Sequence, residues 1–299
     1  TTNIVHNISL GISSGDKFQI SLDGINYLKT IPSEEILKAI GNKLDLKDVT
    51  SINGINFFKG GPKEEEEAVA NVDYISLTFY FRTTGYERNV YLVENVSQLA
   101  RFEENVEGTY VISKGINWKA DVTFRNGINP TEDIVNVGER DVYYAANAVR
   151  VGFVEEKIVE NVLDVREEEQ LTRKIFDLSD NEIRGYGTSF GSLDYYNVKH
   201  NKDIQPPALI PETVTKLSEF DEYVPYIPLD DNSKILELIK TNSKSESGDY
   251  YYQGRVKINI WIEGWDADCF NAILRDSLMI QLKFKSAREL EQSNYKIGI

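Results

Sequence analysis

Three carboxylates near the C-terminal end of the sequence are the residues whose spacing comes closest to a chemical site. Glu263, Asp266 and Asp268 follow one another closely, as oxygen ligands of a calcium ion can do. They lack the central glycine and the distal glutamate of an EF-hand loop. Asp266 is also well placed to N-cap a short helix, which is the simpler account. The sequence therefore offers both a calcium site and a helix cap.

The same stretch contains two tryptophans and the only cysteine. Cys269 excludes an intrachain disulfide, and it would share the apolar face of the short helix with Ala272 and Ile273. That position predicts a small buried side chain rather than a nucleophile. Trp261 and Trp265 could stack on sugar rings, but aromatic side chains on a strand more often pack in a core. These residues therefore favour structure over catalysis.

Two segments with a period of two flank the carboxylates and must position them. Apolar residues alternate with polar ones before the carboxylates (Val256, Ile258, Ile260, Ile262) and after them (Leu278, Ile280, Leu282, Phe284). This period predicts strands with one buried face each. We expect a strand, a short helical connection and a second strand that together close a β-sandwich.

Similar alternation occurs earlier in the chain and then stops. Residues 75–81 alternate in the same way, and shorter strand patterns occur near residues 110, 120–124 and 149–153. The tripeptide Gly-Ile-Asn recurs at irregular spacing, which predicts turns that lead into strands. Residues 155–250 are charged, Gly/Tyr-rich and proline-rich in turn, with short helices expected at 211–220 and 233–239. We interpret 155–250 as an insertion of mixed helix and loop in a core formed by residues 15–154 and 251–299.

The first strand pattern suggests a role beyond the fold. Residues 1–14 place five residues on one face: Ile4, His6, Ile8, Leu10 and Ile12. An ordinary edge strand explains this pattern. The alternative is a donor strand that completes the sheet of a neighbouring copy, since an apolar strand needs a groove to fill.

Composition excludes several classes of function. The net charge of −15 over 299 residues argues against nucleic acid and against an anionic membrane surface as partners. With His6 and His200 as the only histidines, we expect no Ser/His/Asp or Cys/His triad, and nucleotide-binding fingerprints and the HExxH motif are absent. No apolar run is long enough to span a membrane. The Thr-Thr start leads us to expect a signal peptide that has been removed.

Three segments resemble a known family. Residues 73–92, 143–153 and 258–284 are similar to exported proteins of low-GC Gram-positive bacteria, broadly the camelysin/TasA family. The resemblance implies a jelly-roll-like β-sandwich and secretion. In several members it also implies assembly into extracellular fibres by donor-strand exchange. It carries over no catalytic residue.

From these observations we expect a non-enzymatic structural subunit of a cell-surface filament or biofilm matrix. Its partners would be further copies of itself in a head-to-tail polymer, together with matrix or cell-wall polymers. No cofactor is expected apart from the calcium candidate. The alternatives are a monomeric secreted adhesin or carbohydrate-binding module and, less favoured, a secreted hydrolase that uses a pair of carboxylates.

Overall fold

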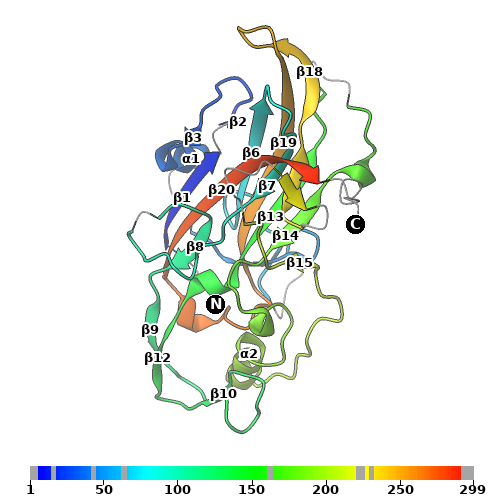
Figure 1. Ribbon diagram of the computed structural model, residues 1–299. Helices are drawn as coiled ribbons and strands as arrows, with labels where there is room; N and C mark the ends of the chain where they lie inside the picture. Colours follow the sequence, from blue (N-terminus) through cyan, green and yellow to red (C-terminus); the bar gives the residue numbers. More distant parts are fainter. Residues whose placement is uncertain are drawn as a thin grey trace, which may run out of the picture.

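The chain forms two large β-sheets packed face to face (Figure 1). The computed structural model describes residues 6–14, 18–41, 45–61, 66–104, 106–159, 164–219, 226–228 and 232–290. Strands make up 41% of the structure and helices 12%, so the predicted mainly-β sandwich class is confirmed. The predicted jelly-roll topology stays a prediction.

Within the described ranges, one sheet has seven strands and the other nine. The seven-stranded sheet contains β1 (His6–Ser14), β3 (Thr30–Ile31), β7 (Asn89–Leu92), β8 (Tyr110–Ser113), β16 (Tyr226–Pro228), β17 (Lys234–Glu237) and β20 (Ser277–Leu290). The nine-stranded sheet contains β2 (Phe18–Ser21), β4 (Asp48–Thr50), β5 (Phe58–Lys59), β6 (Ile75–Thr83), β13 (Val149–Glu156), β14 (Arg173–Phe176), β15 (Thr213–Val214), β18 (Ile239–Lys244) and β19 (Tyr250–Glu263).

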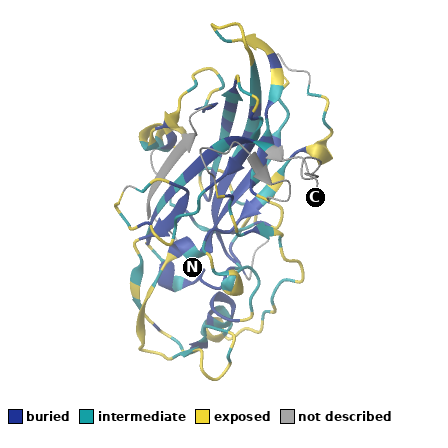
Figure 2. Ribbon diagram, viewed as in Figure 1, coloured by how far each residue is buried: buried dark blue, intermediate teal, exposed yellow. Residues whose placement is uncertain are grey.

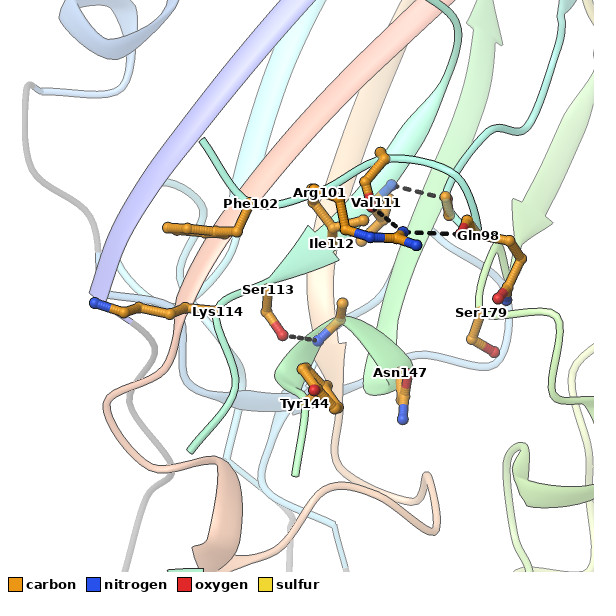
Figure 3. A pocket seen from close by; sticks show the side chains of 13 residues that line it. Gln98, Arg101, Phe102, Val111, Ile112, Ser113, Lys114, Tyr144, Asn147 and Ser179 are labelled. Atoms are coloured by element: carbon orange, nitrogen blue, oxygen red, sulfur yellow. Dashed lines mark hydrogen bonds between the residues drawn. The ribbon is translucent and has the colours of Figure 1, made fainter. Parts of the chain in front are cut away.

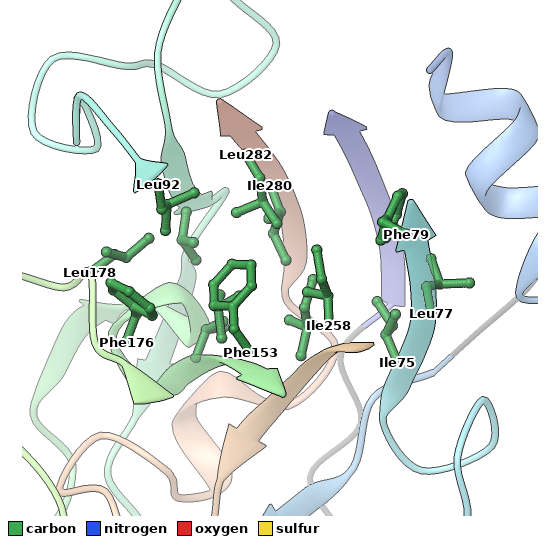
Figure 4. Close-up of a cluster of buried hydrophobic side chains, with 14 of the residues drawn as sticks. Ile75, Leu77, Phe79, Leu92, Phe153, Phe176, Leu178, Ile258, Ile280 and Leu282 are labelled. Carbon is green, nitrogen blue, oxygen red and sulfur yellow. The ribbon is translucent and has the colours of Figure 1, made fainter. Parts of the chain in front are cut away.

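The core lies between the two sheets, where their alternating apolar side chains meet (Figure 4). Phe284 of β20 packs edge-on against Phe81 of β6 and Phe153 of β13, with ring centroids 5.1 and 6.0 Å apart. Such edge-to-face pairs stabilise a core beyond simple area burial. The inward pattern predicted for residues 75–81 is confirmed, because every second residue of β6 is buried.

The predicted strand, connection and strand near the C-terminal end are confirmed as β19, the 3₁₀ turn η4 (Asn271–Ile273) and β20. The two strands lie in opposite sheets, so the connection crosses from one sheet to the other. The outward face of β19 differs from the prediction. Asn259 and Trp261 are buried on that face, because the segment with β4 and β5 covers it and Phe57 packs edge-on against Trp261.

The segment 155–250 contributes strands to both sheets. β14, β15 and β18 belong to the nine-stranded sheet, and β16 and β17 belong to the other. The helix predicted at 233–239 is therefore wrong, since residues 234–237 form β17. The helix predicted at 211–220 is also wrong, since its described part contains β15. Pairing with distant strands decided both outcomes.

Helices and small ribbons cover the ends of the sandwich. Figure 1 shows α1 (Ser33–Ala39) beside β1, and α2 (Ser192–His200) at the opposite end beside β9 (Ile116–Lys119) with β12 (Arg140–Tyr143) and β10 (Phe124–Arg125) with β11 (Ile134–Val135). The other 3₁₀ turns are η1 (Ala145–Ala148), η2 (Glu168–Gln170) and η3 (Glu182–Arg184). Figure 2 shows buried residues gathered between the sheets and exposed residues at these ends. In the part of the chain that the structure describes, no helix is long and apolar enough to cross a membrane.

Candidate functional site

The strand proposed as a subunit interface lies in the sheet of its own chain. His6, Ile8, Leu10 and Ile12 are on β1, whereas Ile4 lies outside the described residues. β1 runs parallel to β20 on one side and antiparallel to the short β3 on the other. It therefore occupies a position inside the seven-stranded sheet and not at its rim.

The register between β1 and β20 aligns the interface positions with the core. Leu10 lies opposite Ile280, and Ile12 lies opposite Leu282. Both β20 residues are buried in the main core. The first strand is thus paired along the part of β20 that contributes most to the interior of the sandwich.

One edge of β20 is occupied by β8 and β7, and β1 pairs with residues 277–284 along the other edge. β8 pairs with residues 278–281 of β20, and β7 pairs with residues 284–287. Removal of β1 would leave the backbone N–H and C=O groups of that other edge unpaired, and unpaired buried backbone groups are costly. The sheet therefore requires a strand in this position, whichever chain supplies it.

The three candidate metal ligands bind different partners, and Asp268 forms an ion pair with Arg184 at 2.7 Å. Glu263 accepts hydrogen bonds from the Trp261 indole (2.9 Å) and from the Trp265 backbone (3.1 Å). Asp266 forms an ion pair with Arg150 at 2.5 Å. Among the described residues, no group of His, Cys, Asp or Glu side chains is arranged to hold a metal ion.

The predicted capping role of Asp266 is wrong. The 3₁₀ turn η4 starts at Asn271 and has Phe270 at its N-cap position. Asp266 instead accepts a bond from the backbone N–H of Asp268 at 2.9 Å and directs its other oxygen to Arg150. The buried positive charge prevails because an unpaired guanidinium in the interior would be far less stable than an uncapped short turn.

Arg150 is the centre of a buried ionic network. It extends from β13, is 2% exposed, and places Nη2 3.0 Å from Asp177 and 2.5 Å from Asp266. Its Nη1 donates to the backbone oxygen of Val149 at 3.1 Å. Asp177 follows β14, and Asp266 lies in the connection after β19. One guanidinium thus joins three segments at this end of the nine-stranded sheet.

A second arginine joins the same connection to the end of the sandwich. Arg184 of η3 donates to Asp268 at 2.7 and 3.0 Å. It also donates to the side chain of Asn126 at 2.8 Å and to the backbone oxygen of the same residue. Arginine suits this role because its planar fork supplies several donors in a fixed geometry.

Burial dominates the acid–base behaviour of this network. Burial raises the pKa of Asp266 to about 7, against the opposing attraction of Arg150. Burial also raises the pKa of Glu263. For Arg150, burial alone would lower the pKa, but Asp266 and Asp177 outweigh that effect and raise it. Raised carboxyl pKa values in the interior are typical of groups removed from water.

A cavity of about 370 Å³ adjoins the network. Arg150, Asp177 and Tyr186 line it together with the threonines of the β15 edge, Thr213 and Thr215. Asp266 is 1% exposed and does not line the cavity. Because Arg150 binds both aspartates, they are held by one cation and do not flank a substrate as the carboxylates of a glycosidase do. The arrangement is suited to holding three segments together.

Sequence reasoning identified only Asp266 and Asp268 among the members of this network. Arg150 is the single charged residue in the buried run 149–153 of β13, and a charged residue among buried neighbours indicates that a buried partner exists. That pattern could have marked Arg150, but it could not have identified Asp177 or Asp266 as the partners.

Comparison with known proteins leaves the chain without an assigned relative. No family model matches the sequence, and neither a curated protein nor a solved structure matches it.

Proposed function

We propose that this chain is an extracellular structural subunit that assembles into a filament by exchange of strand β1 between copies. The observation that carries the proposal is the pairing of β1 with β20, in which Leu10 and Ile12 lie opposite Ile280 and Leu282. A β1 strand from another copy has the same sequence and would meet the same register. The resemblance to fibre-forming exported proteins supports the same conclusion.

The free energy of exchange depends on contacts that only the assembled copies make. A large aliphatic side chain that becomes buried contributes roughly 1.5–3 kcal/mol, so a strand with three such residues, Ile8, Leu10 and Ile12, would bind strongly to the groove that it fills. The same contacts form within one chain or between two chains. Contacts that form only between two assembled copies therefore decide whether the polymer is more stable than the monomer. Donation in one direction is a heterologous contact, which can propagate into an open fibre.

A disulfide between β1 and β20 provides a direct test. Ser9 and Met279 are register partners, and paired Cα atoms of neighbouring strands lie within the range that a disulfide spans. In Ser9→Cys/Met279→Cys, oxidation would hold β1 in its own chain. We expect the oxidised protein to stay monomeric and the reduced protein to form filaments, as judged by negative-stain microscopy and size-exclusion chromatography.

Two controls make the outcome decisive. The single variant Ser9→Cys under the same oxidant shows whether the chemistry alone affects assembly, since the native Cys269 is buried. A chain that lacks residues 1–14 should not form filaments. Filaments from the truncated chain or from the oxidised double variant would refute strand exchange.

One surface favours a second candidate, a monomeric carbohydrate-binding module. On the outer face of the nine-stranded sheet, the Arg82 guanidinium lies between the rings of Tyr27 and Tyr251, 4.0 and 4.3 Å from their centroids. Arg255 and Lys257, which both form ion pairs with Glu156, lie beside it on the same face of β19. Half-buried aromatic rings and cations on a sheet face suit an acidic glycan. A monodisperse protein at high concentration that binds acidic polysaccharide on a glycan array would favour this candidate.

A further inference from the structure

A second cavity lies where strand β8 loses its outer neighbour. The segment 94–97 first runs beside β8: the Thr109 N–H donates to the Glu94 oxygen, and the Val96 N–H donates to the Thr109 oxygen, each at 2.8 Å. The chain then turns away at residues 98–102. A cavity of about 510 Å³ lies at the point where this segment leaves β8, as Figure 3 shows.

The backbone of β8 faces this cavity with alternate residues. The Lys114 N–H donates to Ser277 of β20 at 3.0 Å, whereas the Val111 N–H donates to the Ser97 hydroxyl at 3.1 Å, on the opposite side. Because backbone groups of successive residues in an antiparallel strand point to opposite edges, Ser113 faces the same way as Val111, two residues before it. The Val111 carbonyl and both backbone groups of Ser113 therefore point toward the cavity and pair with no described strand.

The cavity carries positive charge in an otherwise acidic chain. Its lining includes Arg101 and Lys114 and contains no carboxylate, although the chain has 48 acidic residues against 33 basic ones. Arg101 is held in place, because its Nη1 donates to the backbone oxygens of residues 98, 99 and 100 at 3.0–3.2 Å. In the described part of the chain, its Nη2 and Nε make no hydrogen bond. A guanidinium fixed in this way is preorganised for an anion.

We propose that this cavity binds a short extended peptide with an acidic side chain, which adds a strand to the free edge of β8. The peptide backbone would pair with the Val111 carbonyl and with Ser113, and its carboxylate would meet Arg101 or Lys114. Strand addition to an open sheet edge obtains affinity from backbone hydrogen bonds and specificity from flanking side chains. Tyr144 and Phe102 at the rim (Figure 3) supply apolar contact for the neighbouring peptide side chains. This site is separate from β1 and independent of strand exchange.

The test uses a phage-displayed library of short random peptides, selected on the whole chain. We expect the enriched peptides to contain Asp or Glu and to lack proline at central positions, because proline cannot donate a backbone hydrogen bond. Binding of an enriched synthetic peptide should weaken about tenfold or more in Arg101→Gln/Lys114→Gln, since charge-assisted hydrogen bonds of this kind contribute on that order. The matched control is Arg140→Gln/Lys119→Gln, on the β9–β12 ribbon, which should bind as the wild type does.

Backbone recognition needs its own measurement. Addition of the peptide should shift the NMR amide resonance of Ser113, and a version with a central proline should not. The proposal is overturned if no peptide is enriched, if enrichment shows no acidic preference, or if Arg101→Gln/Lys114→Gln binds the peptide unchanged. A peptide that binds without any effect on Ser113 would likewise exclude strand addition.

Discussion

At the scale of single residues, the buried Arg150 network governs how this end of the sandwich is held together. Asp177 and Asp266 come from different connections and meet one guanidinium. A buried ion pair is weak evidence for net stabilisation, but loss of one partner is strongly destabilising, because it leaves an uncompensated charge in the interior.

The first prediction concerns the dependence of stability on pH. The pKa of Asp266 in the folded protein is about 7, above its ordinary value of 3.8. Between these values the folded state binds the proton more tightly than the unfolded state does. The contribution of protonated Asp266 to the stability of the fold is therefore full below about pH 4 and is lost as the pH rises through about 7. Asp266→Asn cannot titrate, so we expect the wild type to lose stability relative to this variant from pH 4 to pH 8.

Urea unfolding of both proteins across this pH range measures the difference in their free energies of unfolding. The charged neighbours that face Asp266 and influence its titration are Arg150, Asp177 and Asp268. Other carboxylates affect both proteins equally and cancel. If the wild type instead gains stability relative to Asp266→Asn as the pH rises, Asp266 is ionised in the folded state and the attraction of Arg150 exceeds the effect of burial.

The second prediction is the effect of removing the buried cation. Arg150→Met keeps the length of the side chain but leaves two carboxylates without their partner. We expect a loss of about 3–5 kcal/mol in the free energy of unfolding at neutral pH, measured by chemical denaturation. The control is Arg255→Met, whose side chain is 36% exposed in its ion pair with Glu156; it should cost less than about 1 kcal/mol. Equal losses in the two variants would contradict a central role for Arg150.

At the scale of elements, close backbone contact fixes the connection after β19. The Gly264 N–H donates to the Val49 oxygen at 2.9 Å, and a Cβ at Gly264 would collide with the carbonyl oxygen of Gly60. The β4–β5 segment that covers Trp261 can pack this tightly only because both contact positions lack side chains. The glycine is therefore required for the buried outer face of β19.

The third prediction tests this contact. Gly264→Ala should destabilise the protein by about 1–3 kcal/mol, the usual cost of forcing extra atoms into a packed interior, and should loosen the cover over Trp261. Unfolding curves and Trp fluorescence report both effects. Gly185→Ala is the control, since its Cβ would meet its nearest neighbour at 3.4 Å. A neutral Gly264→Ala would mean that the two loops separate without cost.

At the scale of the whole molecule, the net charge of −15 opposes association of copies. Charges on neighbouring subunits of a filament repel one another, and salt reduces this repulsion over a Debye length of about 10 Å at 0.1 M. The apolar burial and backbone pairing that hold an exchanged strand are not weakened by salt. Assembly of the copies should therefore become faster as the ionic strength rises.

The fourth prediction is that filaments form faster in about 0.5 M NaCl than in about 0.01 M NaCl at neutral pH, as followed by light scattering. The oxidised Ser9→Cys/Met279→Cys protein is the control for non-specific aggregation, because it should not scatter at either concentration. Slower assembly at high salt would indicate that attraction between opposite charges, rather than strand insertion, holds the copies together.

The sequence by itself determined the features that depend on local alternation. The inward residues of β6, β19 and β20 were predicted correctly because a strand turns every second side chain to the same face. The burial of Cys269 was predicted correctly as well. These features need no knowledge of which strands are neighbours.

Only the tertiary structure decided the features that depend on pairing. Arg150 and Asp266 are 116 positions apart, and no local pattern links them. The strands within 155–250 form because distant strands supply their hydrogen-bond partners, and β1 lies beside β20 from the far end of the sequence. Local periodicity determines which face of a strand is apolar. Which strands become neighbours depends on the relative stability of all possible pairings, and that depends on the packing of the whole sandwich.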